Sequence, residues 1–230
     1  MGLNERQRQI LEWTEKKQRI SVSLLAKKLY VSEMTVRRDL DKMEQEGFLR
    51  RYHGGAVANS EHMQDPIDLR MHVNEKEKRD LAKKAEAHLQ NGQTVFLPGC
   101  STCAFLIPYL KKYENIHVVT NSIQFLTVLS KMRIRCTLTG GEYYEKDKTL
   151  VGRDCENFLR SINTDIAFLA CDGISDDGMV TVKDESQAAL VRIGFRNSAK
   201  RVILSDRSKL GAKYTYNICR TDEADEIIVI

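Results

Sequence analysis

A run of hydroxyl and guanidinium side chains lies on a predicted helix over residues 32–43. Ser32 suits the N-cap of this helix, because its hydroxyl can accept a free backbone N–H group of the first turn. Val36, Leu40 and Met43 are spaced for one apolar face. The side chains left to point elsewhere are Thr35, Arg37, Arg38 and Lys42. Such groups near a helix N-terminus can hydrogen-bond phosphates and base edges in the major groove of DNA.

The flanking segments decide what this helix is part of. Residues 20–30 predict a second short helix, with an N-cap at Ser21 or Ser23, and the connection to Ser32 is only a tight turn long. Two short amphipathic helices joined in this way form a helix-turn-helix. Residues 48–57 predict a basic strand pair that turns near two glycines, which would be a wing.

The alternative is a solvated surface helix with an ordinary pair of charges. The helix pair, the tight turn and the basic hairpin agree with one another, which favours binding to double-stranded operator DNA. The predicted DNA-binding residues are Ser32, Thr35, Val36, Arg37, Arg38, Lys42, Arg50, Arg51, His53, Gly54 and Gly55.

Length and charge predict two domains. A chain of 230 residues exceeds one average domain. Residues 1–60 carry 12 basic and 8 acidic side chains, whereas the remainder carries 24 of each. The excess positive charge therefore lies on the segment expected to meet a polyanion. We predict a DNA-binding domain over residues 1–57, a linker over 58–73 and a larger domain over 74–230.

Composition excludes several other classes. No run of about 20 apolar residues and no signal-peptide core is present, which predicts a cytoplasmic chain that makes no contact with membranes. Cys100 and Cys103 form a C-x-x-C, but no second pair has zinc-ligand spacing, so packed or loop thiols are favoured over a metal or redox site. No cofactor, metal site or catalytic residue is predicted.

Residues 74–230 predict a mixed α/β domain. A charged helix over 74–89 comes first, and strands then alternate with helices, which indicates a mostly parallel sheet covered on both faces. The expected strands are 94–97, 116–120, 135–139, 166–170, 201–204 and 226–230. The expected helices are 101–110, 123–132, 156–162 and 185–198.

Small and hydroxylated residues follow five of these strands, at the sheet edge where ligands bind in such folds. Glycine and hydroxyl groups before helix N-termini suit a phosphate, Lys209 adds a positive charge, and Asp172 and Asn121 suit sugar hydroxyls. The predicted ligand is a phosphorylated polyol. Its predicted contacts are Ser101, Thr102, Thr120, Asn121, Ser122, Gly140, Gly141, Asp172, Gly173 and Lys209.

These motifs resemble the DeoR family of bacterial transcription regulators over nearly the whole chain. The resemblance is carried by residues 32–40 and 49–56 in the first domain, and by residues 119–122, 139–141, 150–152, 172–174 and 206–209 in the second. It implies a winged helix-turn-helix repressor of a sugar-utilisation operon. Its second domain would resemble ribose-5-phosphate isomerase and release the operator when a phosphorylated sugar effector binds.

The same resemblance implies a homodimer or homotetramer. The chain departs from the family at Pro98 and Cys100, where aspartate and glycine are frequent, and near Glu185, where the usual lysine does not follow. A sugar-phosphate isomerase with a DNA-binding appendage is the alternative. Asp172 and Lys209 resemble parts of an isomerase site, but a second carboxylate and a glycine-rich lysine loop are not apparent, which favours binding without turnover.

Overall fold

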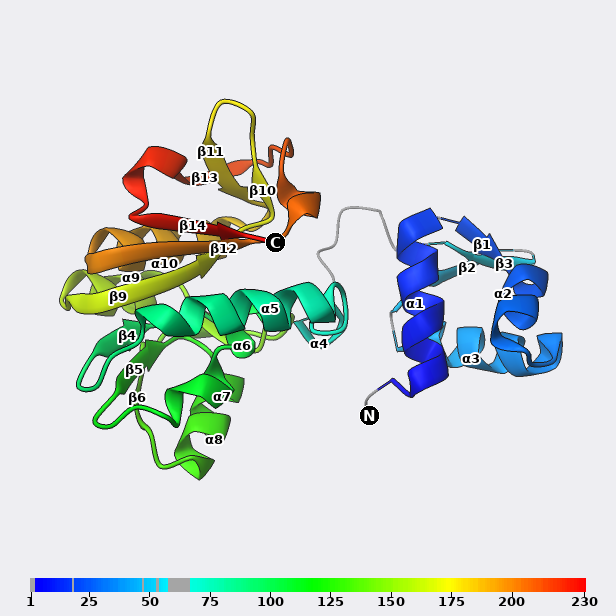
Figure 1. Cartoon of the computed structure of the whole chain (residues 1–230), viewed down its shortest axis with the longest axis horizontal. Helices are drawn as coiled ribbons and strands as arrows, with labels where there is room; N and C mark the ends of the chain where they lie inside the picture. The colour runs from blue at the N-terminus through cyan, green and yellow to red at the C-terminus, as the bar shows by residue number, and fades with distance from the viewer. Residues whose placement is uncertain (1–2, 18, 47, 53, 58–66) are drawn as a thin grey trace. The chain divides into compact units, whose positions relative to one another are not determined.

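The computed structural model describes residues 3–17, 19–46, 48–52, 54–57 and 67–230, and the chain forms two compact units, Met1–Val73 and Asn74–Ile230 (Figure 1). The predicted contact residue His53 and most of the predicted linker, residues 58–66, lie outside the described residues. Within the described ranges, no helix is long and apolar enough to cross a membrane.

The first unit is a winged helix-turn-helix, as predicted. Its helices are α1 (Glu5–Lys17), α2 (Val22–Leu29), α3 (Glu33–Gln45) and the short α4 (Ile67–Arg70). Its antiparallel sheet has the order β1 (Arg19–Ser21), β3 (Gly55–Val57), β2 (Arg50–Tyr52). The hairpin is confirmed, but strand β1 was not predicted, because three residues are too few for a periodic pattern to show.

Local chemistry fixes the two helices of the motif. The Ser21 hydroxyl accepts the Leu24 N–H at 3.2 Å and so begins α2. Tyr30 ends that helix in the left-handed conformation, with φ of 54°, and its N–H bonds to the Ala26 carbonyl. The Ser32 hydroxyl then accepts the Thr35 N–H at 3.2 Å, which confirms Ser32 as the N-cap of α3.

The second unit contains a six-stranded sheet in which every described pair is parallel, in the order β14-β12-β9-β4-β5-β6. The bounds of these strands in chain order are β4 Thr94–Phe96, β5 His117–Thr120, β6 Arg135–Leu138, β9 Thr164–Ala170, β12 Ser198–Ser205 and β14 Glu226–Val229. The predicted α/β class with a parallel sheet is confirmed.

Helices cover both faces of this sheet. They are α5 Glu75–Ala85, continued by the 3₁₀ turn η1 (Glu86–His88), α6 Ser101–Ala104, α7 Ile107–Leu110, α8 Ile123–Lys131, α9 Arg153–Arg160 and α10 Glu185–Arg196. Val95 and Phe168 pack in the core layer beneath α5 to α8, whereas their neighbours Phe96 and Leu169 pack in the layer beneath α9 and α10. The alternation follows from the two-residue repeat of a strand.

Several elements differ from the prediction. The helix expected over 101–110 is divided into α6 and α7, and Pro108 lies in the first turn of α7. A hairpin of β7 (Glu142–Tyr144) and β8 (Thr149–Val151) was not predicted. A small antiparallel sheet was missed too. Its strands are β10 (Gly173–Ile174), β11 (Met179–Val182) and β13 (Tyr216–Arg220), and two further 3₁₀ turns are η2 (Arg207–Lys209) and η3 (Thr221–Glu223).

Candidate functional site

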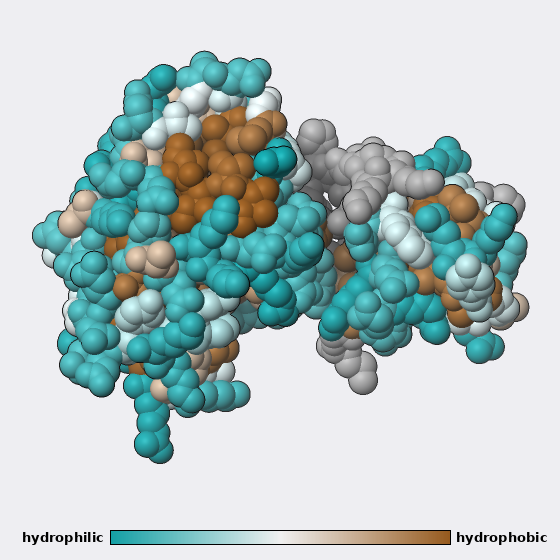
Figure 2. Space-filling model, in the orientation of Figure 1, coloured by the Kyte–Doolittle hydropathy of each residue, from teal (hydrophilic) through white to brown (hydrophobic). Residues whose placement is uncertain are grey.

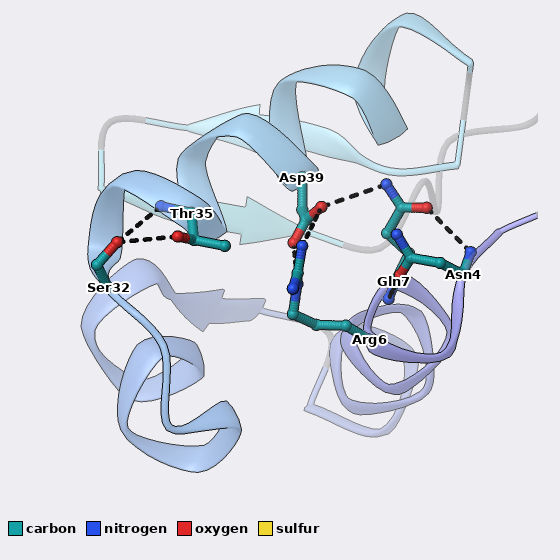
Figure 3. Close-up of polar contacts among 6 residues, drawn as sticks. All are labelled: Asn4, Arg6, Gln7, Ser32, Thr35 and Asp39. Carbon is teal, nitrogen blue, oxygen red and sulfur yellow. Dashed lines mark hydrogen bonds and ion pairs between the residues drawn. The ribbon is translucent and has the colours of Figure 1, made fainter.

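The inner side of α3 is held to α1 by a buried carboxylate. Asp39 is 7% exposed, and its two oxygens accept the Arg6 Nε–H at 2.5 Å and the Arg6 NH2 group at 3.2 Å (Figure 3). The Gln7 amide donates to the same carboxylate at 3.3 Å. The hydrogen bond with Asp39 raises the pKa of Arg6 above its ordinary value. The pair therefore fixes how α3 is presented, and the sequence analysis did not single it out.

The outer side of α3 carries most of the predicted DNA contacts. Arg37, Arg38 and Lys42 are exposed, and the guanidinium of Arg37 lies 3.4 Å from a carboxylate oxygen of Glu33. The hydroxyl oxygens of Ser32 and Thr35 lie 2.9 Å apart at the start of the helix. These side chains form one polar, mostly cationic surface.

One predicted contact is placed differently. Val36 is fully buried in the core of the first unit, so its side chain packs the helix in place. Met34, which was not predicted, is 61% exposed in the first turn of α3. The i, i+4 and i+7 spacing already gave Val36 this inward direction.

The wing lies beside α3. Arg51 forms an ion pair with Asp41, and its backbone N–H donates to Glu44 at 2.6 Å, so the wing is tied to the helix. Arg50 is exposed on the same strand. Helix α3 and the wing border an open hollow of about 420 Å³ within the first unit. Its lining residues are Arg37, Glu44, Arg51, Tyr52 and Gly54.

Gly55 has a structural position in the wing. A Cβ atom there would lie 2.2 Å from the Ile20 carbonyl oxygen and 2.5 Å from the Tyr52 hydroxyl, so a side chain does not fit. Gly54 has a φ of 101°, which favours glycine, and nothing crowds it. The glycine pair therefore allows the tight turn and close strand approach that bring the wing arginines beside α3.

The predicted effector loops meet at the carboxyl ends of the parallel strands. Asn121 is fully buried, and its amide accepts the Gly99 N–H at 2.8 Å and donates to the Leu150 carbonyl at 2.9 Å. Thr120 and Ser122 are equally buried, and Ser122 caps α8 through the Phe125 N–H. The Asn121 side chain therefore ties its loop to the loop of Gly99 and to β8, whereas the Thr120 hydroxyl accepts the Ser122 N–H within its own loop.

The loops that follow β4 and β6 differ in which groups they expose. Ser101 is 6% exposed, while Thr102 is partly exposed. Gly140 and Gly141 are exposed, and both have positive φ angles of 76° and 115°. A Cβ atom would meet nothing at Gly140, whereas at Gly141 it would lie 2.4 Å from the Val151 carbonyl oxygen, so a side chain does not fit there.

Asp172 and Lys209 follow neighbouring strands. Asp172 is partly exposed, and its carboxylate accepts the Lys183 N–H at 2.9 Å. Lys209 lies in η2, beside β12, and is partly exposed. Burial raises the pKa of Cys171 to about 12, and the charge of Lys209 opposes that rise, which indicates that this lysine lies near the loop of Asp172. Gly173, by contrast, is buried in β10.

Sequence reasoning missed two residues at this end. Lys183 is exposed, and its ammonium lies 4.7 Å from the centre of the Tyr214 ring. Lys183 follows β11, which was itself not predicted, and this explains why its proximity to Asp172 was not apparent.

The comparison with known families assigns both units. Residues 6–62 match the DeoR-like helix-turn-helix domain, and residues 73–229 match the DeoR C terminal sensor domain. The chain belongs to the DeoR family. This DeoR-family chain is therefore a DNA-binding transcriptional regulator with a C-terminal sensor domain.

Individual relatives have similar lengths. The glycerol-3-phosphate regulon repressor of Escherichia coli is 27% identical over 228 residues, which cover 99% of this chain and 90% of the relative. The L-fucose operon activator of Haemophilus influenzae is 32% identical over 209 residues, which cover 90% of this chain and 84% of the relative.

Solved structures resemble the chain in fold. An eIF2B delta subunit from Chaetomium thermophilum has a TM-score of 0.50 at 15% identity, covering 66% of this chain and 54% of that one. A ribose 5-phosphate isomerase from Plasmodium falciparum has a TM-score of 0.44 at 18% identity, covering 59% and 52%. Likeness at this level concerns the arrangement of elements and carries no information about activity.

Proposed function

We propose that this DeoR-family regulator represses a sugar-utilisation operon and leaves its operator when a phosphorylated sugar binds residues 74–230. The observation that supports the proposal most is the pairing of two surfaces in one chain. The first unit has a cationic helix face beside a basic wing, and the second has polar loops with a lysine at the carboxyl ends of a parallel sheet.

Arg37, Arg38 and Lys42 on α3 would contact the major groove, with Ser32 and Thr35 near the backbone of the DNA. Arg50 would follow the adjacent phosphates from the wing. Arg51 would contribute indirectly, because its ion pair with Asp41 keeps strand β2 close to α3. The proposed partner, operator DNA, supports a location in the cytoplasm, where a bacterial chromosome lies.

Asp172 and Lys209 are the main proposed effector contacts. The carboxylate would accept sugar hydroxyls, and the ammonium would pair with the phosphate. Gly140, Gly141 and Thr102 would supply further donors. Asn121, Thr120 and Ser122 would act by holding these loops, because their side chains are buried and hydrogen-bonded within the protein.

We infer that the sensor unit binds this ligand and does not convert it. The relatives compared above are named as a regulon repressor and an operon activator. Isomerisation needs a base that moves a proton between adjacent carbons and a cation that stabilises the enediolate. Turnover of ribose 5-phosphate that disappears in Asp172→Ala would contradict this inference.

The test is a fluorescence-anisotropy titration of the full chain on DNA from upstream of its own gene, repeated with a panel of sugar phosphates at fixed salt. One compound should release the DNA, and Lys209→Ala should abolish that release without weakening DNA binding. Lys213→Ala, which removes a nearby ammonium that pairs with Asp177, is the matched control. Tighter DNA binding on addition of the sugar phosphate would instead identify a co-repressor, which reverses the proposed sign.

A further inference from the structure

Cys100 and Cys103 lie on either side of a proposed effector loop. Cys100 is the N-cap of α6, and its sulfur accepts the Cys103 backbone N–H at 3.4 Å. Cys100 is partly exposed, whereas Cys103 is fully buried. The two residues between them are Ser101 and Thr102. A link between the sulfurs would therefore close a ring around the two hydroxyls proposed to meet the effector.

The two thiols also contact each other. A hydrogen bond with Cys100 raises the pKa of Cys103 well above its ordinary value, and burial adds to the rise. The Cys103 sulfur lies 3.5 Å from the Phe168 carbonyl oxygen, so the core holds it beside Cys100. Cys103 is thus kept as a thiol, whereas the Cys100 sulfur accepts the Cys103 backbone N–H and is partly exposed, so a peroxide can reach it from solvent.

We propose that Cys100 and Cys103 form a reversible disulfide when a peroxide oxidises this chain, and that the bond restrains the loop of Ser101 and Thr102 against the effector. The second part rests on the proposed effector site, whereas the first part does not. The sequence alone favoured two packed thiols, and the partly exposed position of Cys100 against a buried, hydrogen-bonded partner changes that assignment.

The chemistry proceeds in two steps. The Cys100 thiolate attacks one peroxide oxygen, the O–O bond breaks, and the departing hydroxide takes a proton to become water, which leaves a sulfenic acid on Cys100. The Cys103 sulfur then attacks the sulfenic sulfur, the S–S bond forms, and the hydroxyl group leaves as water with the Cys103 proton. Two thiols are oxidised and one hydrogen peroxide is reduced to water.

The effect on the effector follows from the burial of Ser101. Its side chain is 6% exposed, so the loop must turn for its hydroxyl to reach a ligand. A ring closed through Cys100 and Cys103 limits that rotation. Oxidation should therefore weaken the response to the sugar phosphate, by about tenfold if the coupling is typical.

The sequence makes the disulfide directly measurable. Trypsin cleaves after Lys84 and Lys111, and the peptide over residues 85–111 contains Cys100 and Cys103 and no other cysteine. After hydrogen peroxide treatment of the full chain and alkylation without reductant, this peptide should carry no alkyl groups and weigh about two mass units less than the thiol form. Reduction should restore both alkylation sites. A peptide that stays fully alkylated, or that gains only oxygen, would overturn the proposal.

Variants locate the two roles. Cys103→Ser should leave a sulfenic acid on Cys100 that reacts with dimedone, and Cys100→Ser should leave Cys103 unoxidised. Cys136→Ser is the matched control, because Cys136 is a partly buried thiol on β6, and it should leave the peptide result unchanged. Since Cys103 is in the core, the wild-type peptide result stands as evidence even where Cys103→Ser folds poorly.

Effector titrations on oxidised and reduced protein then test the second part. Reduced protein that responds to a sugar phosphate about tenfold more strongly than oxidised protein supports it. An equal response of the two forms overturns it. If the reduced protein responds to no sugar phosphate while the disulfide still forms, the proposed effector fails and the redox pair stands.

Discussion

Asp39 shows how one residue serves a binding surface that it does not reach. Its carboxylate is buried and meets Arg6 and Gln7, so it orients α3 from behind. Asp39→Asn should destabilise the first unit by about 1–3 kcal/mol, because the substitution weakens a buried charge-assisted network. Urea unfolding followed by circular dichroism measures this. Asp41→Asn, at an ion-paired position that is 53% exposed, is the control and should cost well under about 1 kcal/mol. Equal losses for the two variants would contradict the positioning role.

Arg38 belongs to the opposite side of the helix, where it is exposed. If it contacts a base, Arg38→Ala should cost about 1–3 kcal/mol of operator binding and relax the sequence preference at one position. If it contacts a phosphate, all sequences should weaken alike and the salt dependence should fall by about one unit. Anisotropy titrations at several salt concentrations separate these results. Arg160→Ala, an exposed arginine on α9, should change neither quantity, and unchanged operator binding by Arg38→Ala would exclude a DNA contact.

At the scale of single residues, the sequence predicted which residue types lie at each candidate site, but not which of their side chains are accessible to a ligand. Spacing placed Val36 and Arg38 on different sides of one helix, and the structure agrees. The chemistry of Asn121 suggested a ligand contact, yet its amide is consumed by Gly99 and Leu150, residues 22 and 29 positions away. Pairings across such separations depend on how loops from different strands meet, which a local pattern does not contain.

Among the elements, the wing depends on a strand that is too short to be predicted. β1 pairs with β3 through Ile20 and Ala56, and Gly55 lies against the Ile20 carbonyl oxygen. Gly55→Ala should cost about 1–3 kcal/mol by overpacking and displace the wing from α3. Amide hydrogen exchange should show lost protection in β1 to β3. The amides of β9 and β12 are the internal control. Unaltered protection in β1 would show that the wing accommodates a side chain at this position without displacement, which would contradict the prediction.

The parallel sheet carries a pH-sensitive position at His117 in β5. Burial lowers the pKa of His117 below its ordinary 6.5, and the charge of Arg135 lowers it further. Just below pH 6.5, the unfolded chain therefore binds more protons than the folded chain does. The free energy of unfolding should fall as the pH drops through this range. His117→Gln, which can keep a hydrogen bond to Thr137, should flatten that fall. Urea unfolding at several pH values measures the slope, and equal slopes in both proteins would refute the assignment.

Elements with long periodic patterns were predicted well, and short or irregular ones were not. The alternation of strands and helices identified the parallel sheet, because buried strands read as apolar runs. The small sheet of β10, β11 and β13 was missed, since its strands of 2, 4 and 5 residues are joined by polar turns. Its absence from the prediction also concealed Lys183 beside Asp172.

For the whole molecule, a dimer would let two copies of α3, the expected recognition helix, act together. Apolar residues gather on the sensor unit over β10 and β14 (Figure 2). Nearby, Leu210 is 48% exposed and forms an isolated β-bridge with Ile174. The backbone N–H of Arg207 donates a hydrogen bond to the carbonyl of Ile230. If the chain forms the homodimer or homotetramer that the family resemblance implies, this region, at the outer strand of the sheet, is the expected interface. A two-fold dimer would present two recognition helices to half-sites about 34 Å apart.

Leu210→Asp should then dissociate the assembly, because a carboxylate would be buried without a partner at the interface. Sedimentation velocity should show a smaller species, and affinity for an operator with two half-sites should fall by about 10²–10⁴, since the second contact would no longer be intramolecular. Tyr143→Asp on β7 is the matched control, because Tyr143 is 56% exposed on the same unit but on a different element. If Leu210→Asp sediments as the wild type does and Tyr143→Asp does not, the hairpin of β7 and β8 forms the interface instead.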